Sequence, residues 1–166
     1  MTNEKEHFDR WYKRPLESLY VDEHAGFAIL ILSFPLAERY LRQKSRMFAP
    51  TQLGEPFYRE LLNLFPGLAD TNFARQFWGQ YRHGLLHQAT VQLFKANEVC
   101  IKNDLASPVH IEPPGTKFTV SPVRFARKIV DAIELDFETF VGAGTKTPPL
   151  SSVAITAGTS GVSRID

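Results

Sequence analysis

The chain lacks the features typical of membrane, secreted and strongly charged proteins. Its single cysteine, Cys100, excludes an internal disulfide and a cysteine-rich zinc site, and it fits a reducing compartment. Its 19 Lys and Arg residues nearly balance 18 Asp and Glu residues, which excludes a strongly cationic nucleic-acid coat and an acidic solvating chain. The first residues form no apolar signal-peptide core, and the longest apolar stretch, 25–37, is shorter than the roughly 20 residues of a membrane helix. We therefore expect a cytoplasmic protein with no membrane partner.

The motifs of several large enzyme classes are also missing. There is no Ser-His-Asp order, no CxxC pair and no Walker pattern. The segment 142–146 resembles a phosphate loop only superficially, because no helical pattern follows it. His83 and His87 are spaced i, i+4 and could form one edge of a metal site, but no third ligand is obvious. We expect neither a metal nor another cofactor.

The length of 166 residues and the 43% hydrophobic content are typical of one globular domain. Apolar residues at helical spacing predict four main helices, at about 20–46, 55–64, 70–95 and 122–141. Alternating apolar pairs around Pro113-Pro114-Gly115 predict a small β-hairpin or an irregular excursion over about 98–120. The expected fold is mainly α, a four-to-five-helix up-and-down bundle with this excursion before its last helix.

The ends of the chain differ in composition from the region between them. Residues 1–19 predict either a mobile N-terminal arm or a short helix broken near Pro15, and the pattern does not decide between the two. Residues 20–142 contain the helical domain, with a kink expected at Pro35. Residues 143–166 are rich in Gly, Ser and Thr, which predicts a flexible C-terminal tail.

The third predicted helix carries a polar stripe without permanent charge. On an ideal helical wheel at about 100° per residue, the stripe consists of Gln76, Gln80, His83, His87 and Thr90. A stripe that faces solvent normally contains Lys and Glu, so an uncharged one suits a half-buried groove against a ligand or a partner. Arg82 lies at the apolar edge of the same helix, and its long side chain can bend toward this groove.

The order Arg82-His83-Gly84-Leu85-Leu86-His87, read as Arg-polar-x-x-x-His on a late helix, resembles the signature of the HEPN (higher eukaryotes and prokaryotes nucleotide-binding) superfamily. The resemblance covers about residues 20–141, through the order and spacing of the helices more than through residue identity. It implies a homodimer in which two copies of the motif face each other and cleave RNA without a metal ion, in stress response or defence. Arg82 would then bind the scissile phosphate, His87 would act as general acid or base, and His83 would orient the site.

Members of this superfamily also include toxins paired with a cognate antitoxin protein, and the resemblance implies such a partner here. One subgroup has a tyrosine two residues after the histidine, where this chain has Ala89, so the nucleotidyl-modification switch of that subgroup is not expected. Independently of the family, imidazole can take either proton role near neutral pH, and guanidinium binds phosphate oxygens. The alternative is a catalytically inactive module that binds a nucleotide, RNA or protein, or a helical interaction protein in which these residues are structural.

Several further residues are candidates for substrate binding, each with a structural alternative. Glu38 either orients Arg82 or forms an i, i+4 surface pair with Arg42. Arg39 and Arg42, in the basic end of the first long helix, either contact phosphates or form a solvated face. Tyr81 either stacks on a base or packs in the core. The complete set of candidates for substrate binding is Gln76, Gln80, Tyr81, Thr90, Glu38, Arg39 and Arg42.

Overall fold

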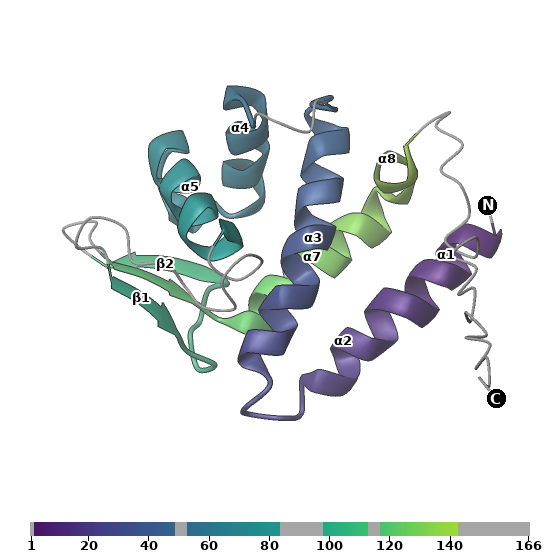
Figure 1. Cartoon of the computed structure of the whole chain (residues 1–166), viewed down its shortest axis with the longest axis horizontal. Helices are drawn as coiled ribbons and strands as arrows, with labels where there is room; N and C mark the ends of the chain where they lie inside the picture. The colour runs from purple at the N-terminus through teal and green to yellow at the C-terminus, as the bar shows by residue number, and fades with distance from the viewer. Residues whose placement is uncertain (1, 49–52, 84–97, 113–116, 143–166) are drawn as a thin grey trace, which may run out of the picture.

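The computed structural model describes residues 2–48, 53–83, 98–112 and 117–142 (Figure 1). They form a mainly α protein, a helical bundle with a small sheet before its last helices, in agreement with the predicted fold class. The helical elements are α1 (Thr2–Phe8), η1 (Asp9–Lys13), α2 (Arg14–Leu19), α3 (Gly26–Lys44), α4 (Glu55–Leu64), η2 (Pro66–Leu68), α5 (Thr71–Trp78), η3 (Gly79–His83), α7 (Pro122–Leu135) and α8 (Phe137–Val141). Of these, η1 and η3 are π-helical and η2 is a 3-10 turn.

Helix α3 is the central helix, and it crosses α7 in the middle of the molecule (Figure 1). The apolar residues spaced i, i+4, i+7 and i+11 along it are fully buried, and they are Leu30, Phe34, Ala37 and Leu41. The helix continues as one α-helix through Pro35. Leu32, two residues after Leu30, is 44% exposed although it is apolar. Leu32 is exposed because apolar residues surround most of α3, while the neighbouring elements cover only part of the circumference of this helix.

Aromatic rings from four elements fill the core beneath α3. Phe125 of α7 stacks at 4.8 Å between centroids on Phe34 of α3 and, at the same distance, on Phe65, which follows α4. The ring centroid of Phe77 in α5 lies 6.1 Å from that of Phe118 in the sheet. Full burial of such a side chain contributes about 1.5–3 kcal/mol, so these rings join the bundle and the sheet into one core.

The predicted excursion is a three-stranded mixed sheet with strand order β1-β3-β2. Strand β2 (Val109–Glu112) pairs antiparallel with β3 (Lys117–Val120), which confirms the hairpin. Strand β1 (Glu98–Ile101) adds to β3 in parallel, with Val99 opposite Phe118. The parallel partner was not predicted, because strand alternation reports which face is buried and not which strand lies alongside.

The structure decides between the two predictions for the N-terminal segment, and it divides the last predicted helix into two. The segment before residue 20 is helical and not an arm, since Phe8 and Leu16 are buried in the core. The last predicted helix, 122–141, is two helices, because Asp136 leaves helical geometry with φ −132° and ψ 50°. Gly142, at φ 84°, ends α8 as predicted. The predicted tail, 143–166, lies outside the described residues.

Within the described residues, no helix combines the length and the apolar character that crossing a membrane requires.

Candidate functional site

Arg82 is carried by the π-helical turn η3, which directly continues α5. Helix α5 begins as predicted, because the Asp70 carboxylate accepts a hydrogen bond from the Phe73 amide at 2.8 Å. A π-helix closes hydrogen bonds from i to i+5, so its chain winds more slowly than that of an α-helix. The residues of η3 therefore depart from the angular positions that an ideal α-helical wheel gives them.

Glu38 of α3 holds Arg82 through two hydrogen bonds. Arg82 Nε donates to Glu38 Oε2 at 2.8 Å, and Arg82 Nη2 donates to Glu38 Oε1 at 3.4 Å. Glu38 Oε1 also accepts from Nε of Arg42, one turn along α3, at 2.9 Å. The Glu38 side chain is only 14% exposed and that of Arg82 is 29% exposed. The two alternatives that the sequence left open for Glu38 therefore coexist, and the carboxylate joins α3 to η3.

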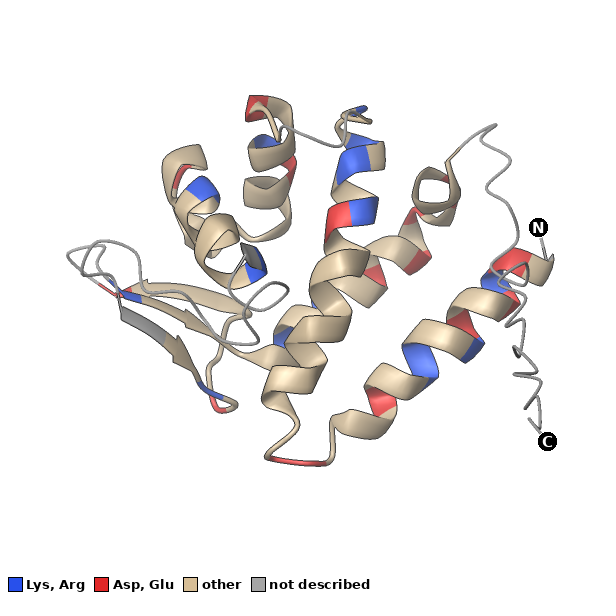
Figure 2. Ribbon diagram, viewed as in Figure 1, with Lys and Arg blue, Asp and Glu red and all other residues tan. Residues whose placement is uncertain are grey.

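Arg39 and Arg42 lie on the same side of α3 and are both held in place. The guanidinium carbon of Arg39 lies 4.7 Å from the ring centroid of Phe140, and its Nε donates to the Phe140 carbonyl at 3.3 Å. Arg42 Nη1 donates to the carbonyl of Met47 at 3.5 Å, just beyond the end of α3. Figure 2 shows that basic residues gather in this C-terminal half of α3. Three guanidinium groups of this region are thus held in place, those of Arg42 and Arg82 by the Glu38 carboxylate and that of Arg39 by Phe140.

These charged side chains line one open hollow of about 440 Å³, together with Pro35, Met47 and Phe48. Arg39, Arg42 and Arg82 against Glu38 leave a net charge of two positive. The volume lies within the range of small-ligand sites, about 300–1,000 Å³. An open, cationic hollow with fixed guanidinium groups is suited to the oxygens of a phosphate. Sequence reasoning missed Pro35, Met47 and Phe48, although two apolar residues directly after a basic helix end were a visible signal.

Tyr81 belongs to the core, so the base-stacking alternative is wrong for this residue. Its side chain is fully buried, and its hydroxyl donates to the carbonyls of Cys100 at 3.0 Å and Phe118 at 3.1 Å. These carbonyls belong to adjacent strands, so the hydroxyl ties η3 to the sheet. Burial away from water raises the pKa of Tyr81, so the phenol stays protonated and can donate.

Gln80 is also placed differently from the prediction. It was expected on the polar stripe, yet it is 1% exposed, and neither amide atom has a hydrogen-bond partner among the described residues. Gln76, which precedes the π-turn, is half-buried on α5. The side chain of His83, and the whole of His87 and Thr90, lie outside the described residues.

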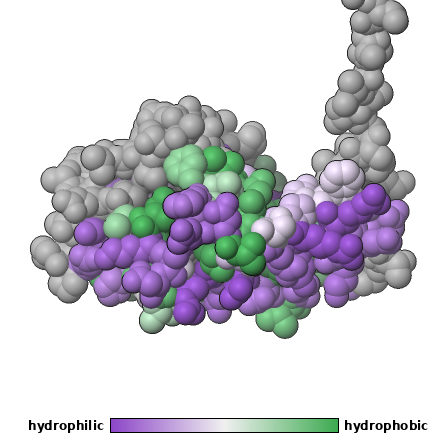
Figure 3. All heavy atoms as spheres, turned by 90° about the horizontal axis from the view of Figure 1, so that it is seen from below, coloured by the Kyte–Doolittle hydropathy of each residue, from purple (hydrophilic) through white to green (hydrophobic). Residues whose placement is uncertain are grey.

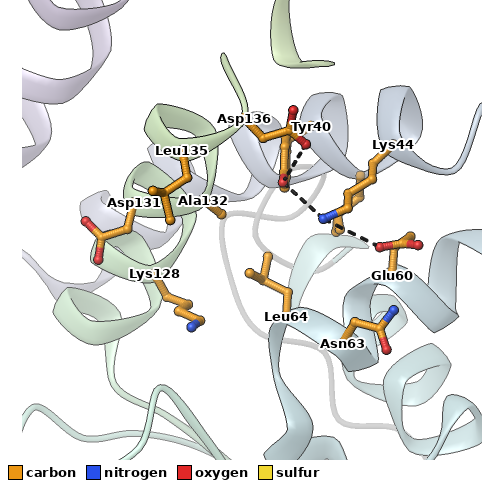
Figure 4. Close-up of a pocket in the computed structure, with 11 residues that line it drawn as sticks. Tyr40, Lys44, Glu60, Asn63, Leu64, Lys128, Asp131, Ala132, Leu135 and Asp136 are labelled. Atoms are coloured by element: carbon orange, nitrogen blue, oxygen red, sulfur yellow. Dashed lines mark hydrogen bonds and ion pairs between the residues drawn. The ribbon is translucent and has the colours of Figure 1, made fainter. Parts of the chain in front are cut away.

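A second hollow, of about 300 Å³, lies between α3, α4 and α7 (Figure 4). There the Tyr40 hydroxyl donates to the Asp136 carboxylate at 3.4 Å, and Lys44 Nζ donates to the Tyr40 hydroxyl at 3.3 Å. Its lining has a net charge of one negative, from Lys44, Lys128, Glu60, Asp131 and Asp136. This sign disfavours a phosphate ligand, which leaves the hollow around Arg82 as the better candidate for an anion.

Comparisons of the chain with known protein families, with curated proteins and with solved structures find no match in any of the three. Within the described ranges, no three His, Cys, Asp or Glu residues lie together as a metal site would require. The candidate site therefore depends on its own geometry and charge.

Proposed function

We propose that this chain is a HEPN-like, metal-independent endoribonuclease of stress response or defence, which cleaves RNA in a groove between two protomers. The observation that carries the proposal is the fixed orientation of Arg82, whose guanidinium is held by Glu38 at the edge of a hollow with two further arginines. A catalytic guanidinium needs such a support, because misplacement by about 1 Å can cost roughly 100-fold in rate.

The reaction requires a cation and two proton-transfer groups. A base removes the proton of a ribose 2′-hydroxyl, and the 2′-oxygen forms a bond to the adjacent phosphorus. The bond from phosphorus to the 5′-oxygen breaks, and that oxygen takes a proton from an acid, which leaves a 2′,3′-cyclic phosphate and a 5′-hydroxyl. Arg82 would stabilise the negative charge on the phosphorane oxygens. His87 of one protomer would be the base and its copy in the second protomer the acid, with His83 orienting them.

The test is cleavage of total RNA by the purified full chain in the presence of EDTA. The wild type is expected to cleave, while Arg82→Ala and His87→Ala are each expected to be at least about 100-fold slower, since each removes one charge-stabilising or proton-transfer group. The matched control is Arg75→Ala, which removes an arginine of α5 that pairs with Glu55 at 3.1 Å, outside the hollow. This control is expected to cleave like the wild type.

Two results would refute the enzyme. One is RNA left intact by every form of the protein, and the other is equal cleavage by the wild type, Arg82→Ala and His87→Ala. If RNA stays intact but binds with an affinity that falls on Arg82→Ala, the chain is a nucleotide- or RNA-binding module. The net positive charge of the hollow favours this second candidate as much as the first.

The homodimer, a cognate antitoxin partner and a cytoplasmic location are further parts of this proposal. The dimer is supported by the outward face of α3, where the exposed residues Ala28, Leu32 and Pro35 are apolar and lead to the hollow. Apolar residues on an outward helix face favour contact with another protein surface.

A further inference from the structure

Phe48 is exposed to solvent at the wall of the cationic hollow. Its side chain is 66% exposed, and it is one of five exposed large hydrophobic residues in the described part of the chain. A single exposed apolar residue is common, but this one shares its hollow with three arginines. An aromatic ring next to fixed guanidinium groups offers two different surfaces to one ligand: a flat apolar face and a set of phosphate donors.

The turn that ends α3 orders the backbone that leads directly into Phe48. The Met47 amide donates to the Arg42 carbonyl at 2.9 Å and the Arg46 amide to the Gln43 carbonyl at 3.1 Å, the bonding pattern of a Schellman motif. Arg46 adopts φ 55°, the left-handed conformation that this motif requires. The Arg42 side chain bonds back to the Met47 carbonyl at 3.5 Å. One arginine of the hollow thus contacts the backbone that carries the neighbouring ring.

We propose that this hollow binds an unpaired nucleotide of single-stranded RNA, with the base stacked on the ring of Phe48 and a phosphate on Arg39, Arg42 and Arg82. The inference rests on the proposed function, because it uses the arginines as groups that bind an RNA phosphate. It adds that Phe48 selects an unpaired base of that RNA. A base can lie on an aromatic side chain only when it is unstacked and unpaired, so the site discriminates against duplex RNA. The volume of about 440 Å³ is sufficient for a ligand of small-molecule size.

The experiment measures binding by the full-length His87→Ala protein, in which the proposed cleavage is blocked. Fluorescence anisotropy gives the dissociation constants of a labelled, unstructured RNA oligonucleotide and of the same strand in a duplex. Phe48→Ala, Phe48→Tyr and Trp11→Ala are added separately. Trp11 is the matched control, because it is an aromatic residue that is 64% exposed and does not line the hollow. Thermal melting checks that Phe48→Ala folds, as expected for an exposed side chain.

Phe48→Ala is expected to weaken single-strand binding by about 5- to 150-fold, the range for loss of one stacked base. Duplex binding should not change, and Phe48→Tyr and Trp11→Ala should bind the single strand like their parent. The inference is wrong if Phe48→Ala binds the single strand as tightly as its parent, or if the parent binds no single strand. It is also wrong if Phe48→Ala weakens the binding of single-stranded and duplex RNA by the same factor. Binding that depends on Phe48 in a wild-type protein that leaves RNA intact would refute the ribonuclease and leave this inference standing.

Discussion

Glu38 is the side chain that connects the two halves of the candidate site. It lies 44 residues before Arg82 in the sequence, and it accepts hydrogen bonds from both Arg82 and Arg42. Partial burial of this cluster reduces solvent screening, so these bonds are worth more than those of an exposed ion pair. The orientation of Arg82 is therefore tied to one carboxylate on another helix.

A double-mutant cycle with Glu38→Gln and Arg82→Ala tests this coupling. Urea unfolding should give an interaction free energy of about 1–3 kcal/mol between the two positions, because they share charge-assisted hydrogen bonds with little exposure. The matched control is the cycle for Glu55 and Arg75, whose side chains are 47% and 56% exposed. That pair should couple by less than about 1 kcal/mol. Equal coupling in the two cycles would show that Glu38 does not hold Arg82 as described.

The sequence predicted the identity of the charged residues better than their contacts. Glu38, Arg39, Arg42 and Arg82 were all candidates, and the structure brings them into one hollow. Tyr81 was left open between base stacking and the core, and its hydroxyl bonds to two strand carbonyls place it in the core. No sequence pattern indicates that bond, because it joins a helix to strands that are distant along the chain.

The contact between the turn η2 and strand β2 depends on a glycine. A Cβ atom built on Gly67 would lie 2.5 Å from the carbonyl oxygen of Val109, so the backbones approach more closely than any other residue allows. Strand β2 pairs with β3, which in turn meets η3 through the hydroxyl of Tyr81. The position of η3, which carries Arg82, thus depends partly on the close approach of Gly67 to the Val109 carbonyl.

Gly67→Ala is expected to destabilise the protein by about 1–3 kcal/mol, because β2 or η2 must move to admit the methyl group. The measurement is the urea midpoint, with Gly79→Ala as control. A Cβ atom on Gly79 would meet nothing within 4 Å, so alanine there should be neutral or stabilise by up to about 1 kcal/mol. Equal effects of the two substitutions would contradict the close approach at Gly67.

The predicted elements agree with the structure where a local pattern specifies them. Helix α4 spans Glu55–Leu64, as predicted, with Pro56 in its first turn and Phe57 and Leu61 buried. The third helix begins where it was predicted, but it is π-helical from Gly79, and Gln80, which was expected on the polar stripe, is buried. A π-helical turn leaves no clear signature in the hydrophobic pattern of a sequence.

The outward face of α3 is the feature that bears on assembly. On the underside of the molecule, hydrophobic side chains also reach the surface near the middle, among hydrophilic ones (Figure 3). On α3, the exposed residues Ala28, Leu32 and Pro35 follow the spacing i, i+4, i+7, and Pro35 also lines the hollow. A two-fold contact along this face would bring two copies of the hollow close together.

Leu32→Asp is expected to convert a dimer to a monomer and to abolish RNA cleavage, because it places a charge in the apolar contact. Sedimentation velocity at micromolar protein measures the first effect, and the RNA assay measures the second. Leu135→Asp is the control, since Leu135 is 89% exposed at the end of α7 and does not lie on α3. A wild type that is monomeric at these concentrations, or a Leu32→Asp protein that remains dimeric, would rule out this contact.

The sequence alone determined which residues are buried along most helices and where several helices begin and end. Helical periodicity, caps and breakers act between residues about four positions apart, so this information is local to each segment. Tertiary structure decided the parallel placement of β1, the burial of Gln80, the hydrogen bonds from Arg82 to Glu38 and the position of Phe48. Each of these depends on which distant surfaces pack together, and that choice is made by the free energy of the whole core.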